Sequence, residues 1–126
     1  MQRYLLAAML ALAPSLAQAA DPAVCTEAEA RFARLGLARP EGPMVLLYKY
    51  TFCPPRLTVK AGSTVTFVNV DPRTSHSVWF KEAGQAESDR FFPEERWSAR
   101  FDTPGEYRYI CGPHADQMAG VLRVEK

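Results

Sequence analysis

The sequence is poor in histidine, in cysteine and in long apolar segments. Its 126 residues include only two histidines and three cysteines, so any site built on these side chains must be small. Basic and acidic residues number 15 and 14, which gives a net charge of +1. A chain this close to neutral has no overall field to attract nucleic acid or an anionic membrane surface. The length allows one small domain.

The N-terminal segment has the pattern of a secretory signal peptide. Arg3 precedes a short apolar run over 5–13, and Ala17-Gln18-Ala19 fits the small-residue rule for cleavage. The run is much shorter than the ~20 residues that cross a bilayer, so an uncleaved anchor is the weaker alternative. We predict a signal peptide at 1–19, cleaved after about Ala19, and an exported, periplasmic protein. Its mature form would be neutral, with no membrane span.

Two regions are expected in the mature chain. Residues 20–43 contain a capping box that starts at Thr26, and Phe32 and Leu35 follow with helical spacing, which predicts a short helix packed on the domain. Residues 44–126 alternate β-forming segments with turn residues, which predicts an all-β domain, an antiparallel sandwich with a short N-terminal helical extension. The expected strands cover 44–50, 57–60, 64–70, 75–81, 96–101, 106–111 and 120–125.

The segment 111–118 carries the most chemistry. It places the thiol of Cys111, the imidazole of His114 and the thioether of Met118 on one short loop after an expected strand. The other histidine, His76, lies in another expected strand. Alone, each has an ordinary structural explanation, as a surface histidine, a small buried thiol or a core methionine. Together, two imidazoles, one thiolate and a weak axial methionine are the ligands of a blue copper site.

The three cysteines leave one over if two of them pair. With Cys111 as a metal ligand, Cys25 and Cys53 are free to form a disulfide, which an oxidising compartment permits. The alternative is that both remain free, buried thiols.

Residues 51–126 resemble the cupredoxins, the family of plastocyanin, amicyanin and pseudoazurin. This resemblance implies a Greek-key β-sandwich and one-electron transport by one copper ion that alternates between Cu+ and Cu2+. It also implies that His114 carries electrons in and out, with redox partner proteins docking near it on an apolar patch. The matching segments are Leu57-Thr-Val-Lys-Ala-Gly62, Val65-Thr-Phe-Val-Asn69-Val-Asp71, His76-Ser-Val78, Asp102-Thr-Pro-Gly105-Glu-Tyr107, Tyr109-Ile-Cys111-Gly-Pro-His114 and Gly120-Val-Leu-Arg-Val124.

Two departures from the family pattern concern the metal site. Three residues separate His114 from Met118, whereas plastocyanin-like loops have four and amicyanin-like loops have two. Gln117 takes the amicyanin position, and an amide oxygen is the axial ligand in some relatives. We favour Met118, because a glycine follows the methionine by two positions in the family, as Gly120 does here.

The second departure lies outside the ligands. Relatives carry an Asn after the first histidine that bonds to a Ser or Thr after the cysteine, and this chain has Ser77 and Gly112 instead. We predict that this link is absent or replaced by backbone, which would give a somewhat softer site because such groups orient the ligands.

The expected function is that of a diffusible, monomeric electron carrier that is not an enzyme. The alternative is a periplasmic copper chaperone or buffer that uses the same four ligands. Copper delivery proteins tend to use sites rich in methionine or histidine, and beyond 1–19 this chain keeps only Met44 and Met118. A copper enzyme would need further copper centres with more imidazoles, and both histidines are already assigned.

Overall fold

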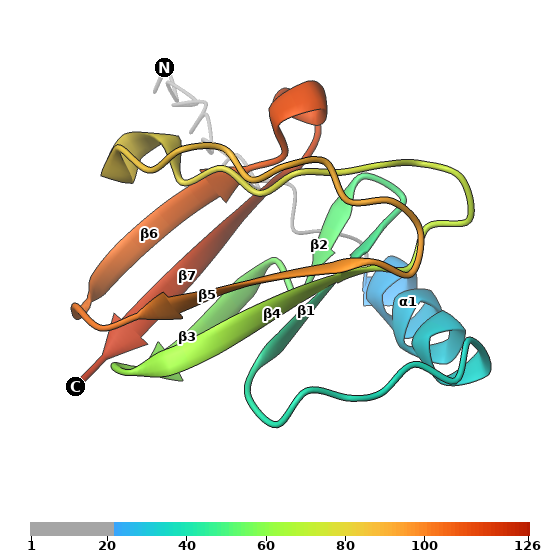
Figure 1. The fold of residues 1–126 in the computed structure, drawn as a ribbon, viewed down its shortest axis with the longest axis horizontal. Helices are drawn as coiled ribbons and strands as arrows, with labels where there is room; N and C mark the ends of the chain where they lie inside the picture. Colours follow the sequence, from blue (N-terminus) through green and yellow to red (C-terminus); the bar gives the residue numbers. More distant parts are fainter. Residues whose placement is uncertain (1–21) are drawn as a thin grey trace, which may run out of the picture.

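The structure is a computed structural model that describes residues 22–126, and the predicted signal peptide at 1–19 lies outside the described residues. Two β-sheets face each other, and the one α-helix of the described residues packs beside β1 and β2 (Figure 1). The elements are α1 (Pro22–Arg34), β1 (Met44–Tyr48), β2 (Thr51–Cys53), β3 (Arg56–Lys60), β4 (Ser63–Asn69), η1 (Lys81–Ala83), β5 (Arg96–Phe101), β6 (Gly105–Ile110), η2 (Gly112–His114) and β7 (Ala119–Glu125).

The two sheets have the strand orders β2-β1-β4-β5 and β3-β7-β6. The predicted two-layer sandwich with an N-terminal helix is therefore confirmed, but its wholly antiparallel arrangement is wrong. Strands β1 and β4 are parallel, and so are β3 and β7. Other strands lie between the two members of each parallel pair along the chain. The alternation of apolar and polar side chains within one strand carries no information about which strand it pairs with.

Two strand assignments also change. The expected strand at 75–81 forms only two isolated bridges, His76 with Phe91 and Trp79 with Ile110. The segment 51–53, which the sequence left without a strand, becomes β2 and pairs with β1 in a tight hairpin. The turn residues Lys49 and Tyr50 both have a positive φ, 47° and 55°, as a two-residue hairpin turn requires.

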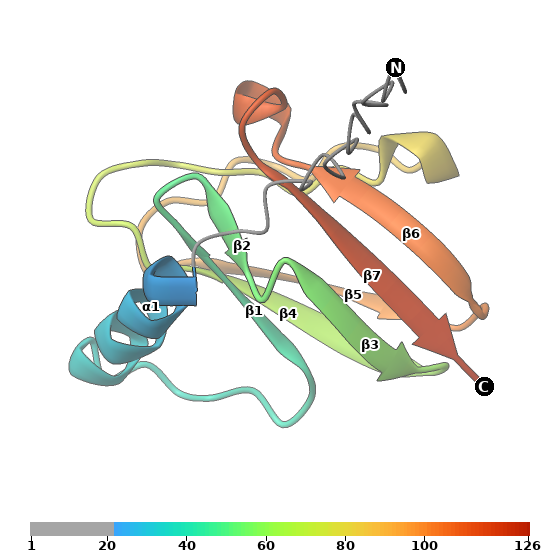
Figure 2. The ribbon, with the colours of Figure 1, turned by 180° about the vertical axis from the view of Figure 1, so that it is seen from behind.

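Helix α1 packs on the outer face of the larger sheet at β1 and β2 (Figure 2). Successive β1 side chains point to opposite faces, so Val45 and Leu47 join the core between the sheets while Leu46 and Tyr48 pack under the helix with Ala28 and Phe32. Burial on both faces explains why β1 is apolar throughout.

The helix begins earlier than the capping box predicted. It starts at Pro22, a residue suited to the first helical turn because its missing N–H has no partner there. The Thr26 hydroxyl donates to the Pro22 carbonyl oxygen at 3.2 Å and so lies inside the helix, not at its cap. The predicted helix is present, and its predicted start is wrong.

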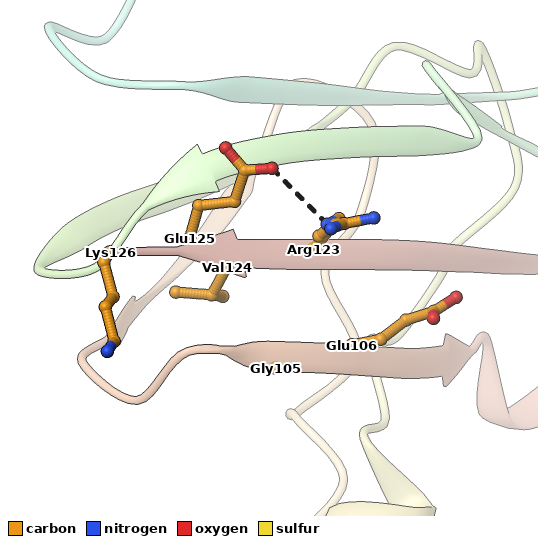
Figure 3. Close-up of a pocket in the computed structure, with 6 residues that line it drawn as sticks. All are labelled: Gly105, Glu106, Arg123, Val124, Glu125 and Lys126. Carbon is orange, nitrogen blue, oxygen red and sulfur yellow. Dashed lines mark ion pairs between the residues drawn. The ribbon is translucent and has the colours of Figure 1, made fainter.

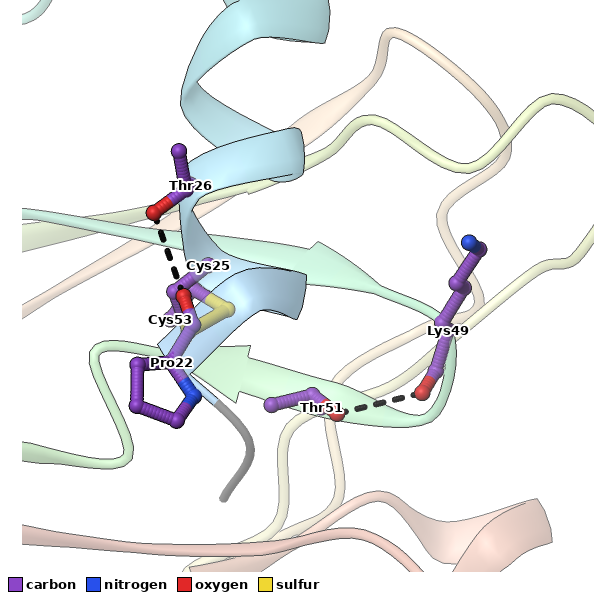
Figure 4. Close-up of a disulfide and its surroundings, with 6 residues drawn as sticks. All are labelled: Pro22, Cys25, Thr26, Lys49, Thr51 and Cys53. Carbon is purple, nitrogen blue, oxygen red and sulfur yellow. Dashed lines mark hydrogen bonds between the residues drawn. A yellow bond between two sulfur atoms is a disulfide. The ribbon is translucent and has the colours of Figure 1, made fainter.

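A disulfide fastens α1 to the sandwich. Cys25 of the helix is bonded to Cys53 of β2, as one of the two sequence alternatives proposed (Figure 4). The Arg31 Nε donates to the Val70 carbonyl oxygen at 2.8 Å further along the helix. The helix is thus held by a covalent bond, by a hydrogen bond and by the apolar cluster beneath it.

The core between the sheets supports the end of β6. Tyr109 contacts Phe52 and Phe67 edge-on, with ring centroids 4.7 and 5.5 Å apart. Cys111 follows with the same strand parity, and both residues belong to this core cluster. At the other end of β6 and β7, Gly105, Glu106 and Arg123–Lys126 line an open, charged hollow that is remote from Cys111 along the strands (Figure 3).

Gly120 is required by Tyr109, its cross-strand partner. A Cβ at Gly120 would lie 2.4 Å from Cζ and 2.5 Å from Oη of Tyr109, whose ring is 2% exposed and enclosed by other aromatic rings. We expect Gly120→Ala to lower the free energy of unfolding by about 1–3 kcal/mol, the usual effect of overpacking a core. Urea denaturation measures the change. In a Tyr109→Leu background the same substitution should have a much smaller effect, and an equal loss in both backgrounds would contradict the contact.

Candidate metal centre

Three nitrogen and sulfur side chains converge at one end of the sandwich. The ligand atoms of His76, Cys111 and His114 all lie within 4.8 Å of one another. The Cys111 Sγ is 3.7 Å from Nδ1 of His76 and 3.4 Å from Nδ1 of His114. The structure therefore brings together three of the four residues that the sequence singled out, from segments 35 residues apart.

These separations suit a single metal ion. With metal–nitrogen and metal–sulfur bonds of roughly 2.1 and 2.3 Å in a trigonal plane, each nitrogen would lie about 3.8 Å from the sulfur. Both observed distances are close to this value. A thiolate with two imidazoles is a soft donor set that favours copper over magnesium or calcium. The described residues thus fit a copper ion.

Backbone hydrogen bonds close the loop that carries Cys111, His114 and Met118. The Cys111 N–H donates to the Met118 carbonyl oxygen at 3.1 Å, and the Met118 N–H donates to the His114 carbonyl oxygen at 2.9 Å. The His114 N–H donates to the Cys111 carbonyl oxygen at 3.1 Å within η2, where Pro113 occupies an early position that needs no N–H partner. The loop geometry is therefore set by the main chain.

His76 is fixed through its backbone and through its outer ring nitrogen. It exchanges two backbone hydrogen bonds with Phe91, of 3.1 and 2.9 Å. Its Nε2 contacts the carboxylate of Asp71, which leaves Nδ1 facing the Cys111 sulfur. Asp71 is itself held, because its Oδ1 accepts from the Lys49 N–H at 3.1 Å. A carboxylate on the outer nitrogen orients a ligand histidine and increases its basicity.

The sequence interpretation did not include Asp71 in the site. The available signal was an acidic residue five positions before a histidine that was itself a proposed ligand. That spacing is uninformative by itself, because the intervening 72–75 is an irregular segment whose path brings the two side chains together.

The two histidines differ in their electrostatics. Burial lowers the pKa of His76, but hydrogen bonds to Asp71 and Cys111 outweigh it and raise the pKa from 6.5 to about 8. Burial, the neighbouring His76 and Arg90 lower the pKa of His114. A proton therefore competes with a metal ion more strongly at His76 than at His114.

Met118 and Gln117 occupy different environments. Met118 is 1% exposed and belongs to the core cluster that contains Cys111. Gln117 is exposed and lines a shallow surface hollow beside His114.

The link between the two ligand segments was predicted to be absent or replaced by backbone, and the structure has the backbone replacement. The Gly112 N–H donates to the Ser77 Oγ at 2.9 Å, so the link exists and backbone supplies one half of it, as one alternative proposed. The Ser77 N–H also points to the Cys111 Sγ at 3.4 Å. The Ser77 hydroxyl donates to the Glu87 carboxylate at 2.7 Å. Glu87 was missed because it lies in a charged loop with no regular pattern.

Tyr50 forms part of the surface around His114. It is 45% exposed, and its ring meets the His114 ring edge-on with centroids 4.8 Å apart. The β1–β2 turn brings it there, and together with Pro113 and Ala115 it lines the hollow beside the histidine. The sequence did not reveal this contact. The predicted strand ran to residue 50, whereas the structure ends β1 at Tyr48 and places Tyr50 in the turn that leads into β2.

The helix content of the described residues is limited to α1 and short 3-10 turns. Within 22–126, no helix has the length and apolar character needed to cross a bilayer.

The fold and the converging donors define a class, the small copper-binding β-sandwich proteins. The model of the copper-binding proteins of the plastocyanin/azurin family matches residues 48–125. The chain is 35% identical over 121 residues to amicyanin-alpha of Methylorubrum extorquens, covering 93% of this chain and 100% of that protein. The chain belongs to the plastocyanin/azurin family, and it is a type 1 copper electron carrier, not an enzyme.

Solved structures show the same fold. Amicyanin from Paracoccus versutus superposes with a TM-score of 0.63 at 28% identity, covering 71% of this chain and 87% of that one. A copper-containing nitrite reductase from Thermus scotoductus gives a TM-score of 0.63 at 28% identity. The match covers 71% of this chain and only 23% of the reductase, so the likeness concerns one part of the larger protein.

Proposed function

We propose that this protein is an exported one-electron carrier in which His76, Cys111 and His114 hold one copper ion and Met118 is its weak axial ligand. The observation that carries the proposal is the trio of donor atoms, gathered within 4.8 Å on segments that backbone hydrogen bonds hold in place. Bound copper supplies the Cu+/Cu2+ couple. The protein keeps the donors in one arrangement, so little has to rearrange when the charge changes.

His114 is the proposed port for electrons. It is the one ligand of the trio that is not fully buried, and its ring lies against the exposed Tyr50. Redox partner proteins would dock on the surface formed by Tyr50, Pro113 and Ala115, where a ring edge of a ligand comes closest to solvent. Export is supported by the disulfide, because such bonds persist in oxidising compartments.

Spectroscopy of the copper-loaded mature protein tests the function. We expect an intense thiolate-to-copper absorption at about 600 nm, the property that names blue copper sites, and a reversible one-electron wave in voltammetry. A colourless protein that retains only Cu+ would instead support the copper chaperone or buffer.

The axial ligand can be identified by comparing two neighbouring substitutions. Met118→Leu removes a weak donor that favours Cu2+, so we expect the reduction potential to rise by about 59 mV or more, a tenfold change for a one-electron couple. Gln117→Leu should leave the potential nearly unchanged, because Gln117 is exposed. Protein-film voltammetry of both variants measures the shifts, and the reverse order would assign the axial position to Gln117.

A further inference from the structure

The loop between η1 and β5 places one carboxylate against Ser77, the residue that follows the ligand His76. Glu87 Oε1 accepts from the Ser77 hydroxyl at 2.7 Å, and Ser77 Oγ accepts from the Gly112 N–H at 2.9 Å. The Ser77 N–H in turn points to the Cys111 Sγ at 3.4 Å. One connected chain of hydrogen bonds thus joins the loop, the residue after His76 and the residue after Cys111.

Glu87 does not reach Ser77 from a free loop. The next residue, Ser88, is paired with Val78: its Oγ accepts from the Val78 N–H at 2.8 Å, and its N–H donates to the Val78 carbonyl oxygen at 3.0 Å. These bonds place Glu87 beside Ser77, whose side chain is fully buried.

Glu87 also occupies the space that a side chain at position 112 would take. A Cβ built on Gly112 would lie 1.7 Å from Glu87 Oε1, 2.6 Å from its Cδ and 3.0 Å from Ser77 Oγ. Gly112 is not among the glycines with a positive φ, so its backbone conformation does not require glycine. The glycine is explained by the carboxylate: any side chain there would displace Glu87 from Ser77.

We propose that Glu87 is a positioning residue for the Cys111 thiolate. The Glu87 carboxylate accepts a hydrogen bond from the Ser77 hydroxyl, which orients the Ser77 lone pairs toward the Gly112 N–H. This orientation fixes the distance between the two ligand segments. That distance determines the hydrogen bond from the Ser77 N–H to the sulfur. The inference rests on the proposed function, in which Cys111 is a copper ligand.

The charge of Glu87 and its hydrogen bond act on the reduction potential in opposite directions. A nearby negative charge stabilises Cu2+, so its removal raises the potential. A donor hydrogen bond to the thiolate withdraws electron density and favours Cu+, so loosening it lowers the potential. Glu87→Gln removes the charge and keeps an acceptor for the Ser77 hydroxyl. Gly112→Ala keeps the charge and breaks the contact between Glu87 and Ser77. Glu87→Ala removes both the charge and the acceptor.

The experiment compares these three variants and the Glu87→Ala/Gly112→Ala double variant. Amide hydrogen exchange of Ser77 and Gly112 is measured by NMR on the metal-free protein, and the potential and thiolate absorption on the copper protein. We expect exchange roughly fivefold faster in Glu87→Ala and Gly112→Ala, as for loss of one net hydrogen bond, and unchanged in Glu87→Gln. The potential should fall in Gly112→Ala, and it should be lower in Glu87→Ala than in Glu87→Gln. The double variant should exchange no faster than either single one.

Two results would overturn the proposal. One is identical exchange and potential in Glu87→Ala and Glu87→Gln, which would reduce Glu87 to a surface charge. The other is strict additivity in the double variant, which would show that Glu87 and Gly112 act independently. Absence of the blue absorption from the unsubstituted protein would instead overturn the proposed function, while the exchange rates of the metal-free protein would still decide the role of Glu87.

Discussion

Cys111→Ala will abolish the intense visible absorption of the copper-loaded protein. The band requires a bond between copper and a thiolate, and Cys111 is the free cysteine among the described residues. His76 and His114 would remain, and imidazoles still bind Cu2+. We therefore expect a weakly coloured copper complex with complete loss of the band, measured by absorption and EPR spectroscopy at equal copper content.

The matched control is the Cys25→Ala/Cys53→Ala double variant. It removes two sulfur atoms that are bonded to each other and lie in the cluster under α1, apart from the cluster that contains Cys111. Its absorption should match that of the unsubstituted protein. Persistence of the band in Cys111→Ala, with native far-UV circular dichroism, would show that the thiolate is not a ligand.

The proposed ligands were readable from the sequence because three of them lie on one eight-residue segment. Cys111, His114 and Met118 are brought together by a short loop, so local spacing carries most of the information. With only two histidines in the chain, His76 was the one candidate for a second imidazole. A site whose ligands came from four separate loops would have left no such pattern.

The groups around the ligands were not readable in the same way. Asp71, Glu87 and Tyr50 reach the site from an irregular segment, a charged loop and a hairpin turn, and each touches a ligand or its neighbour only after the sheets have packed. The parallel pairing of β1 with β4 has the same origin, since it depends on long-range contacts. Local pattern therefore predicted the chemistry of the centre, and tertiary packing determined what surrounds it.

Removing the disulfide should have a large effect on stability and little effect on the copper site. Cys25 and Cys53 are 28 residues apart, and on the chain-entropy model a loop of about this size stabilises the folded state by about 3–4 kcal/mol. We expect the Cys25→Ala/Cys53→Ala variant to lose that amount from its free energy of unfolding. Urea denaturation of the metal-free protein measures it without the added stability that bound copper would provide.

The location of the stability loss distinguishes two roles for the helix. Without the disulfide, α1 keeps the Arg31–Val70 hydrogen bond and the packing of Ala28 and Phe32 on the outer face of the sheet. If these contacts suffice, one cooperative transition remains and moves to lower urea, because the bridge acts mainly on the unfolded chain. If α1 instead detaches first, Leu46 and Tyr48 lose their cover, and amide exchange in β1 rises before the main transition. A loss below about 1 kcal/mol in urea denaturation would contradict a stabilising disulfide, because removing a native bridge from a small domain typically costs about 2–5 kcal/mol.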